Sequence, residues 1–284
     1  MEIINRRQRM FSISRKLRRE AKSVGFVPTM GALHEGHLTL VKEARQMCDV
    51  VIVSIFVNPM QFNAKNDLEK YPRDLTADAA LLAAYEVDYI FAPEAHEIYP
   101  DGFSTYVNVE GITDTLEGAS RPGHFRGVAT VVTILLNTVR PDFAFFGQKD
   151  AQQVAVIRRL RTDLGFETEI IVVPTIREES GLAMSSRNQL LSADEREKAV
   201  VIINALREAK LAFKKGERNA SDLAQIVTKR IATEPLAKLD YVAIVDRDSL
   251  QTVEKIGEDE ALIAVAVYFG NVRLIDNVIL NRKQ

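Results

Sequence analysis

The sequence predicts an α/β protein, with a Rossmann-like domain built on a parallel sheet and a smaller α+β domain after it. Two observations lead to this fold class. Short apolar runs of strand composition alternate with longer segments of helical period in the first part of the chain, and three strand candidates follow one another closely near its end. The chain has 284 residues, enough for two modest domains. We place them at residues 1–175 and 176–284.

The first part contains five apolar runs with the composition of strands that are covered on both faces. They lie at residues 25–29 and 50–56, and near residues 88, 142 and 168. Helical periodicity is clear in three segments between these runs, HLTLVKEARQMC, LTADAALLAAYE and GVATVVTILLNTVR. The basic segment at the N-terminus is interpreted as the solvated face of one further helix.

The second part begins with a long helix and ends in strands. SADE, Ser192 to Glu195, has the form of a capping box that opens a helix running to about Lys214, and a second helix follows from Ser221. DYVAIVD, ALIAVAVYFG and VRLIDNVIL then leave little room for crossover helices. This order predicts a small α+β unit.

Composition indicates an ordinary globular protein. Thirty-seven Lys plus Arg and 39 Asp plus Glu give a net charge of -2, which offers no global reason to bind nucleic acid. Cys48 is the only cysteine, so an internal disulfide is excluded, and a reducing cytoplasm fits. No apolar run reaches membrane-spanning length. We expect a cytoplasmic protein without nucleic-acid or membrane partners, and import into an organelle stays open.

GALHEGHLTLV, Gly31 to Val41, lies where the first predicted strand turns into a helix. Glycines permit a tight turn there, and free amides at a helix N-terminus favour an anion. His34 and His37 add donors, so we interpret the segment as a phosphate site. A Walker motif is excluded because His37 and Leu38 replace its lysine and hydroxyl residue. A zinc site lacks a third ligand apart from Glu35, and a purely structural helix start is the remaining alternative.

Two further segments carry chemistry suited to polyphosphate. GQKD, Gly147 to Asp150, ends a predicted strand and offers a cation at Lys149 and a candidate magnesium ligand at Asp150. MSSR, Met184 to Arg187, offers hydroxyls and a guanidinium near the domain boundary. Each segment alone is more often a solvated turn or loop than a ligand site. Together with the histidines they predict a site for a nucleoside triphosphate.

The motifs resemble those of a known family. HxGH after the first strand with a later MSSR loop is similar to the nucleotidyltransferases that include class I aminoacyl-tRNA synthetases. PTMGALHEGH, VSIFVNPMQF, YPRD, RPGHFRGVATVV, FGQKDAQQ and GLAMSSRN together resemble the pantothenate synthetase (pantoate:beta-alanine ligase) family over the whole chain. That resemblance implies that ATP activates pantoate as pantoyl adenylate with release of pyrophosphate, and that beta-alanine then displaces AMP.

The resemblance also implies roles for individual residues. His37, His34 and Lys149 become the catalytic residues, and ATP with Mg2+ the co-substrate. The implied nucleotide site comprises Met30, Gly31, His34, His37, Gly147, Gln148, Lys149, Asp150, Ile176, Met184, Ser185, Ser186 and Arg187. The implied substrate residues are Gln61 and Gln153, with Asn58, Tyr71 and Arg121 in secondary positions. A homodimer and a second domain that closes over the reaction are further expectations.

Two other functions stay open from the residues alone. One is a nucleotidyl transferase that keeps the nucleotide on its product, which amine-dependent AMP release would distinguish. The other is a tRNA-binding relative or a nucleotide-binding regulator without turnover, although balanced charge disfavours tRNA. His96 and His124 are interpreted as structural or surface residues, and Cys48 as a packing residue.

Overall fold

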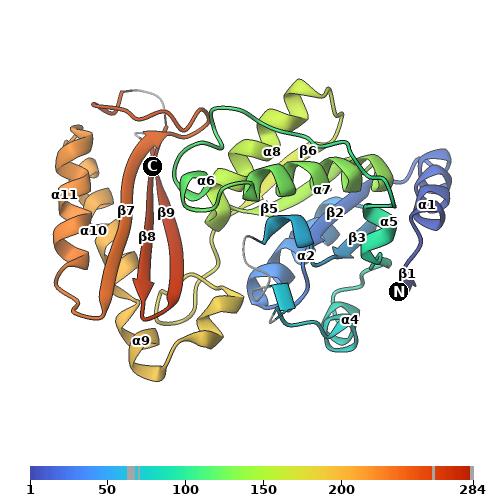
Figure 1. The fold of residues 1–284 in the computed structure, drawn as a ribbon, viewed down its shortest axis with the longest axis horizontal. Coiled ribbons are helices and arrows are strands. Elements are labelled where there is room, and N and C mark those ends of the chain that lie inside the picture. The colour runs from blue at the N-terminus through green and yellow to red at the C-terminus, as the bar shows by residue number, and fades with distance from the viewer. Residues whose placement is uncertain (63–67, 70, 258–259, 282–284) are drawn as a thin grey trace. The chain divides into compact units, whose positions relative to one another are not determined.

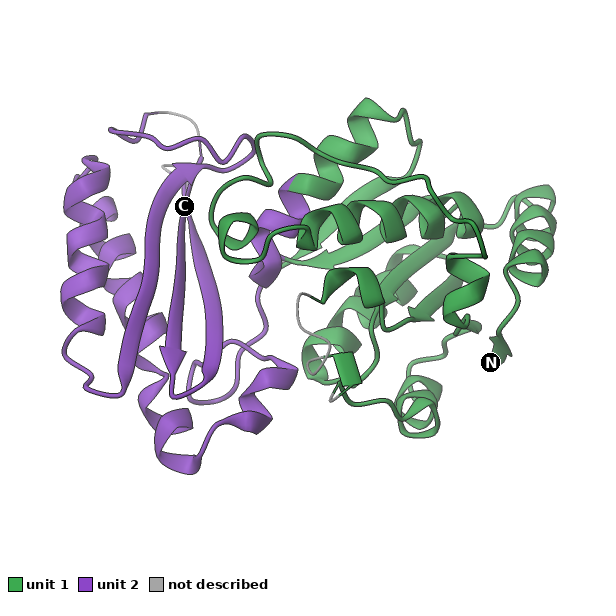
Figure 2. Ribbon diagram, viewed as in Figure 1, with its two compact units in different colours: residues 1–147, 156–174 green, residues 148–155, 175–284 purple. Residues whose placement is uncertain are grey.

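The chain divides into two compact units. The computed structural model describes residues 1–62, 68–69, 71–257 and 260–281. Unit 1 comprises Met1–Gly147 and Val156–Pro174, and unit 2 comprises Gln148–Ala155 and Thr175–Gln284 (Figure 2). The main division falls beside the expected boundary at residues 175 and 176. The segment 148–155 groups with unit 2, although it lies within the range expected for the first domain.

Unit 1 is built on a parallel sheet, which confirms the predicted fold class. In the part of the chain that is described, this sheet has six strands in the order β1-β4-β3-β2-β5-β6 (Figure 1). The strands are β1 (Glu2–Ile4), β2 (Val24–Thr29), β3 (Val50–Ile55), β4 (Tyr89–Phe91), β5 (Phe143–Gly147) and β6 (Glu169–Val173). The sequence pattern missed β1, because a three-residue edge strand with one buried side chain carries no periodicity.

Helices cover both faces of this sheet. Phe26 and Val27 are adjacent in β2 and therefore point to opposite faces, yet both are fully buried. Val27 packs in a cluster with Leu38, Val41 and Ala44 of α2. The helical elements that begin before residue 175 are α1 (Arg7–Arg19), α2 (Glu35–Met47), η1 (Pro59–Gln61), α4 (Leu75–Ala83), α5 (Ala95–Ile98), α6 (Glu117–Ser120), α7 (His124–Val139), η2 (Gln148–Asp150) and α8 (Ala151–Asp163).

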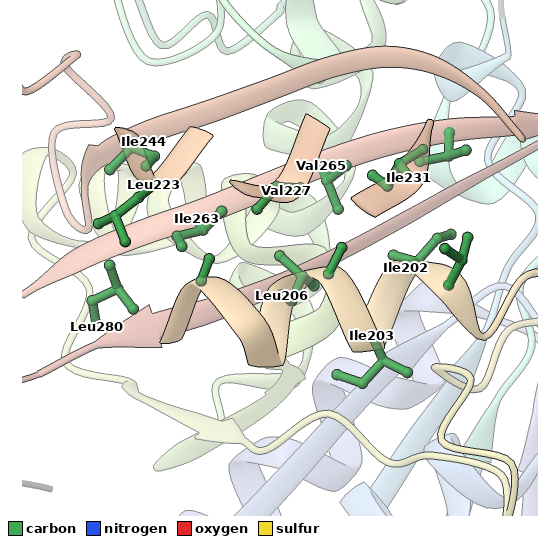
Figure 3. Packing of buried hydrophobic residues seen from close by; sticks show 14 of the residues in the cluster. Ile202, Ile203, Leu206, Leu223, Val227, Ile231, Ile244, Ile263, Val265 and Leu280 are labelled. Atoms are coloured by element: carbon green, nitrogen blue, oxygen red, sulfur yellow. The ribbon is translucent and has the colours of Figure 1, made fainter. Parts of the chain in front are cut away.

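Unit 2 packs helices on an antiparallel sheet. Strands β7 (Ala237–Asp246), β8 (Ala261–Phe269) and β9 (Val272–Leu280) pair in sequence order. The helical elements are η3 (Ser186–Leu190), α9 (Ala193–Lys198), α10 (Val201–Lys214) and α11 (Ala220–Ile231). Figure 3 shows apolar side chains of α10 and α11, among them Leu206 and Val227, meeting those of the sheet, such as Val265. Unit 2 therefore has a hydrophobic core of its own.

The long helix expected from Ser192 to about Lys214 is two helices. Its capping box is present, because the Ser192 hydroxyl accepts from the Glu195 amide at 3.2 Å and the Glu195 carboxylate from the Ser192 amide at 2.8 Å. However, α9 ends at Lys198 and α10 begins at Val201. Helix α9 buries none of its residues, whereas α10 buries a full apolar face. The helix is interrupted where the polar pattern gives way to an apolar one.

No helix within the described residues combines the length and the apolar character that a membrane span requires.

Candidate functional site

A strained loop follows the central strand β2. Gly31 has φ +80 and Ala32 has φ +51, so the chain enters the left-handed region at two successive residues. Asp78 of α4 holds this turn, since its carboxylate accepts from the Ala32 amide at 3.1 Å and from the Leu33 amide at 2.9 Å. Asp78 is only 4% exposed. A Cβ added at Gly31 would lie 2.8 Å from the carboxylate, which explains why this position needs glycine.

The two histidines cap helix α2. The Gly36 amide donates to His34 Nδ1 at 3.1 Å, and the His34 amide donates to His37 Nδ1 at 3.4 Å. The ring centroids lie 4.1 Å apart. Because each Nδ1 accepts a backbone hydrogen bond, the neutral rings carry their hydrogen on Nε2. Two N–H donors therefore stand at a helix N-terminus, where the helix dipole favours an anion.

A polar cluster lies at η1, the turn that follows β3. Asn58 is 1% exposed and Gln61 is 8% exposed. Asn58 Nδ2 donates to Gln61 Oε1 at 2.9 Å, and the Tyr99 hydroxyl donates to Asn58 Oδ1 at 2.7 Å. Burial raises the pKa of the Tyr99 hydroxyl well above its usual value, so this residue stays a neutral donor. The sequence motifs had not indicated Tyr99.

Arg121 and His124 hold the same turn from its other side. The Arg121 guanidinium donates to the Gln61 carbonyl oxygen at 3.2 Å, and His124 Nδ1 lies 3.0 Å from that oxygen. A carbonyl oxygen only accepts, so His124 carries its hydrogen on Nδ1 and its Nε2 accepts from Arg121 at 3.2 Å. His124 is buried, in line with the structural role expected for it. Tyr71 packs edge-on against Phe62, with ring centroids 5.6 Å apart.

Unit 2 brings the later motifs together in one pocket. Lys149, Ser185 and Arg187 line it, although two of them are separated from the first by more than thirty positions in the sequence. Ser185 Oγ accepts from the Arg187 amide at 3.2 Å. Arg273 of β9 lines the pocket as well, and its guanidinium also donates to Asp240 at 2.8 and 2.9 Å. Lys149, Arg187 and Arg273 thus bring cationic groups to the pocket, and Asp276 brings a carboxylate. The excess of positive charge suits an anionic ligand.

Strand β9 supports the backbone of this pocket. Asn277 Nδ2 donates to the carbonyl oxygens of Gln148 and Lys149, each at 3.0 Å, and Gln148 Nε2 donates to Asn277 Oδ1 at 3.0 Å. The neighbouring Asp276 is almost fully buried and accepts from the two terminal guanidinium nitrogens of Arg177 at 2.7 and 3.0 Å. Neither β9 residue belongs to a motif that the sequence analysis singled out.

The remaining predicted residues fall in both units. Gly147 ends β5, and Met30 follows β2 in the strained loop. Ile176 and Met184 are joined by a hydrogen bond from the Met184 amide to the Ile176 carbonyl oxygen at 2.9 Å. Ser186 opens η3, and Gln153 lies half-buried in the first turn of α8. Asp150 has a half-exposed side chain, with its carboxylate 3.7 Å from Lys149 Nζ.

Four residues with clear roles escaped the sequence analysis: Asp78, Tyr99, Arg273 and Asn277. Asp78 had a detectable signal, because it lies four residues before Leu82 on one helix face and both are buried. An acidic residue on an apolar helix face indicates a buried hydrogen-bond role. The other three lie in segments read for strand or loop pattern only. Their partners are between 33 and 129 positions away, and no local pattern indicates such contacts.

Comparison with known proteins covers the whole chain. The family model for pantoate-beta-alanine ligase matches residues 2–279. A pantothenate synthetase from Heliobacterium modesticaldum is 54% identical over 280 residues, which are 99% of each chain. Among solved structures, a pantothenate synthetase from Thermus thermophilus has a TM-score of 0.91 and 42% identity, covering 99% of this chain and 100% of that one.

A second solved structure carries ligands. It is a pantoate-beta-alanine ligase from Francisella tularensis, complexed with beta-gamma ATP and beta-alanine. Its TM-score is 0.80 and its identity 40%, with 100% of this chain and 98% of that chain covered. The family model and these full-length relatives agree, and the chain belongs to the pantoate-beta-alanine ligase family.

Proposed function

We propose that this ligase, which condenses pantoate with beta-alanine and uses ATP, works in two steps. A carboxylate oxygen of pantoate attacks the α-phosphorus of ATP, the bond to the pyrophosphate oxygen breaks, and pantoyl adenylate forms. The beta-alanine amine then attacks the acyl carbon, AMP leaves, and the amine loses a proton as the amide of pantothenate forms. The family match over residues 2–279 supports the overall condensation.

The observation that carries this mechanism is the pair His34 and His37 at the start of α2, whose rings are held by backbone hydrogen bonds. Both Nδ1 atoms accept backbone amides, so both rings direct an Nε2–H away from the backbone contacts. As the bond to pyrophosphate breaks, negative charge moves onto the leaving group. Donors that are already in place stabilise that charge without reorganisation. We assign His37 and His34 to the phosphates, with Met30 and Gly31 lining the same part of the nucleotide site.

The unit 2 pocket supplies positive charge in this proposal. Lys149 acts as a catalytic residue that offsets the repulsion between two anions, and Arg187 with the hydroxyls of Ser185 and Ser186 binds phosphate oxygens. Three of these side chains line one pocket, which supports the assignment. Contacts to the rest of the nucleotide are assigned to Gly147, Gln148, Asp150, Ile176 and Met184.

Pantoate and beta-alanine are assigned to the amide side chains. Gln61 and Gln153 bind pantoate, whose hydroxyls and carboxylate pair with amide groups. Tyr71 and Arg121 take secondary positions. The acyl adenylate is already activated, so placement of the amine can supply much of the rate of the second step without a strong base.

Magnesium fits this site as part of the nucleotide. Within the described residues there is no group of three or more His, Cys, Asp or Glu side chains that could hold a metal ion. Asp150 provides one half-exposed carboxylate. Mg2+ characteristically binds to phosphates plus one or two carboxylates, so Asp150 would hold the ion together with ATP. When bound, Mg2+ neutralises charge on the phosphates.

The test is product release. Purified protein with ATP and Mg2+ is expected to release pyrophosphate when pantoate is added, and to release AMP over many turnovers only when beta-alanine is added too. His37→Ala is expected to slow pyrophosphate release about a hundredfold or more, the usual effect of losing one such donor. His96→Ala serves as the control, because His96 is exposed on α5 and pairs with Glu94 and Glu97. Pyrophosphate release that ignores pantoate would refute the substrate assignment.

We infer a homodimer from the family resemblance. We infer a location in the reducing cytoplasm from the single cysteine, which is buried and free. Light scattering is expected to give twice the chain mass of 31.8 kDa. A mass of one chain at micromolar concentration would exclude the dimer, and recovery of the protein in a membrane fraction would exclude the location.

A further inference from the structure

The buried side chain of Asn58 has an orientation that its backbone neighbours fix. The Met60 amide donates to Asn58 Oδ1 at 3.2 Å, and the Gly127 carbonyl oxygen accepts from Asn58 Nδ2 at 3.1 Å. A backbone N–H only donates and a backbone C=O only accepts. The oxygen and nitrogen of this amide therefore cannot be exchanged without losing both contacts.

The fixed Asn58 amide determines the orientation of the Gln61 amide. Asn58 Nδ2 lies 2.9 Å from Gln61. Since that nitrogen is a donor, the Gln61 atom that faces it must be the acceptor Oε1. The Gln61 Nε2, with two N–H donors, is then the atom that Gln61 directs away from Asn58.

Tyr99 completes the hydrogen bonding of Asn58. Its hydroxyl donates to Asn58 Oδ1 at 2.7 Å, so Asn58 accepts twice and donates twice, the full capacity of an amide side chain. Asn58 is 1% exposed. It has no capacity left to bind a substrate directly.

Helix α7 packs closely enough to keep this arrangement rigid. A Cβ added at Gly127 would lie 2.3 Å from the Met60 carbonyl oxygen and 3.0 Å from the Gln61 amide nitrogen. The backbone of α7 therefore lies directly against the turn at η1 (Figure 1). A close backbone contact of this kind leaves little room for the turn to shift.

We propose that Asn58 and Tyr99 are positioning residues that fix Gln61 as a hydrogen-bond donor toward an oxygen of pantoate. This inference rests on the proposed role of Gln61 in pantoate binding. It gives the site a specificity rule: the group that Gln61 meets must be an acceptor, such as a carboxylate oxygen or a hydroxyl lone pair. Asn58, a secondary substrate position in the family pattern, acts through Gln61 in this proposal.

The first experiment removes the donor that Asn58 offers. Asn58→Asp keeps the shape but places an acceptor oxygen opposite Gln61, which must then turn its Nε2 inward and its Oε1 toward pantoate. We expect the KM for pantoate to rise by more than roughly tenfold, because a donor is replaced by a repelling acceptor. The KM for ATP is expected to stay within about twofold. Equal effects on both substrates, or none on pantoate, would overturn the proposal.

A milder variant, which should disturb the fold less, tests whether Tyr99 acts on Gln61 through Asn58. Tyr99→Phe removes one hydroxyl from a ring that keeps its packing against Phe103, and is expected to raise the KM for pantoate by roughly threefold to tenfold. Tyr106→Phe is the matched control. Tyr106 packs on Phe103 as Tyr99 does but does not hydrogen-bond to Asn58, and the phenylalanine ring of the variant would still lie under Arg126. It is expected to leave both KM values unchanged.

A double-variant cycle shows whether Tyr99 acts through Gln61. Gln61→Met removes both polar atoms of the amide, and Tyr99→Phe in that background is expected to change the KM for pantoate less than about twofold. The same loss in both backgrounds would mean that Tyr99 acts by another route and would overturn the proposal. Failure of the proposed function looks different, since the unmodified protein would then show no pantoate-dependent pyrophosphate release.

Discussion

At the scale of single residues, the buried carboxylate of Asp78 sets the loop that precedes the histidines. Ala32 and Leu33 both direct backbone amides at it, and an ionised carboxylate is the side chain that accepts at both oxygens. The left-handed backbone of Ala32, φ +51, costs conformational energy because this residue is not glycine, and these charge-assisted hydrogen bonds offset that cost. Asp78 therefore acts on the nucleotide site without belonging to its motif.

Asp78→Asn is predicted to weaken ATP binding. The substitution keeps the volume but turns one acceptor into an NH2 group that faces a backbone N–H, so one loop amide loses its partner in a buried place. An unmade hydrogen bond to a charged group costs about 2 kcal/mol, and we expect roughly a tenfold or larger loss in kcat/KM for ATP. Steady-state kinetics measure it.

The control for this change is Asp74→Asn on the same helix. Asp74 caps α4 by accepting from the Ala77 amide at 2.9 Å, and asparagine caps a helix as well as aspartate does. Its kinetics are expected to match the unmodified protein. If Asp78→Asn also leaves kcat/KM for ATP unchanged, the loop does not need its carboxylate.

Cys48 gives a prediction about pH. Burial, with a smaller effect from Asp142, raises the pKa of its thiol from 9.0 to about 11. The raised value means that the folded protein holds this proton more tightly than the unfolded chain. The stability that comes from this difference is complete below pH 9 and is lost as the pH rises toward 11. The thiol stays protonated at neutral pH and is a poor nucleophile.

Denaturant unfolding at several pH values measures this effect. The unfolding free energy is expected to fall between pH 9 and pH 11 by more in the unmodified protein than in Cys48→Ala. Iodoacetamide is expected to label the folded protein at pH 8 much more slowly than the unfolded chain. Rapid labelling of the folded protein would show that the thiol is accessible and not held in this way.

At the scale of elements, local pattern predicted the strands and helices well where each has its own period. Five of the strands of unit 1 and three of unit 2 lie where alternation or apolar runs placed them. The local pattern failed where tertiary packing determines whether an element forms or where it ends. It did not detect the short edge strand β1. It also joined α9 and α10 into one helix, because Ala199 and Val200 between them include no glycine or proline that would end a helix.

Residues that hold the site from distant parts of the sequence could not be predicted either, because their contacts also depend on tertiary packing. The Asn277 side chain in β9 holds the carbonyl oxygens of Gln148 and Lys149, but a strand reading assigns Asn277 only to a face of the sheet. The residues that touch ligand in the proposed mechanism lie in motifs. Among the residues that position them, Asn58 lies in the same motif as Gln61, whereas Asp78, Tyr99 and Asn277 lie in other elements.

Asn277→Asp is predicted to impair the Lys149 segment selectively. The substitution replaces two donated hydrogen bonds by contacts between a carboxylate and two carbonyl oxygens, which repel it. We expect the KM for ATP to rise roughly tenfold or more, while the KM for pantoate changes little. Asn219→Asp is a suitable control, because Asn219 caps α11 and aspartate serves there equally. A larger effect on pantoate than on ATP would contradict the assignment of Lys149 to the nucleotide.

At the scale of the whole molecule, the residues assigned to the reaction are divided between two units with separate cores. His34, His37 and Gln61 belong to unit 1, and Lys149 and Arg187 belong to unit 2. The resemblance of the motifs indicated the family, and the family model and full-length relatives confirm it. The fold class could be predicted from the sequence because strands of parallel and antiparallel sheets have different hydrophobic patterns along the chain.

Removal of metal is expected to stop the reaction without destabilising the fold of the whole protein. A resident structural metal would contribute to stability, so a chelator would lower the melting temperature. The described residues hold no cluster of three metal-ligating side chains, and the proposed mechanism brings Mg2+ in with ATP. EDTA is therefore expected to leave the melting temperature of the nucleotide-free protein unchanged and to abolish pantoate-dependent pyrophosphate release. Rates restored by added Mg2+ should follow the concentration of the Mg2+–ATP complex. A chelator that lowers the melting temperature without nucleotide would show that the protein carries its own metal, and the assignment of Mg2+ to the substrate would be wrong.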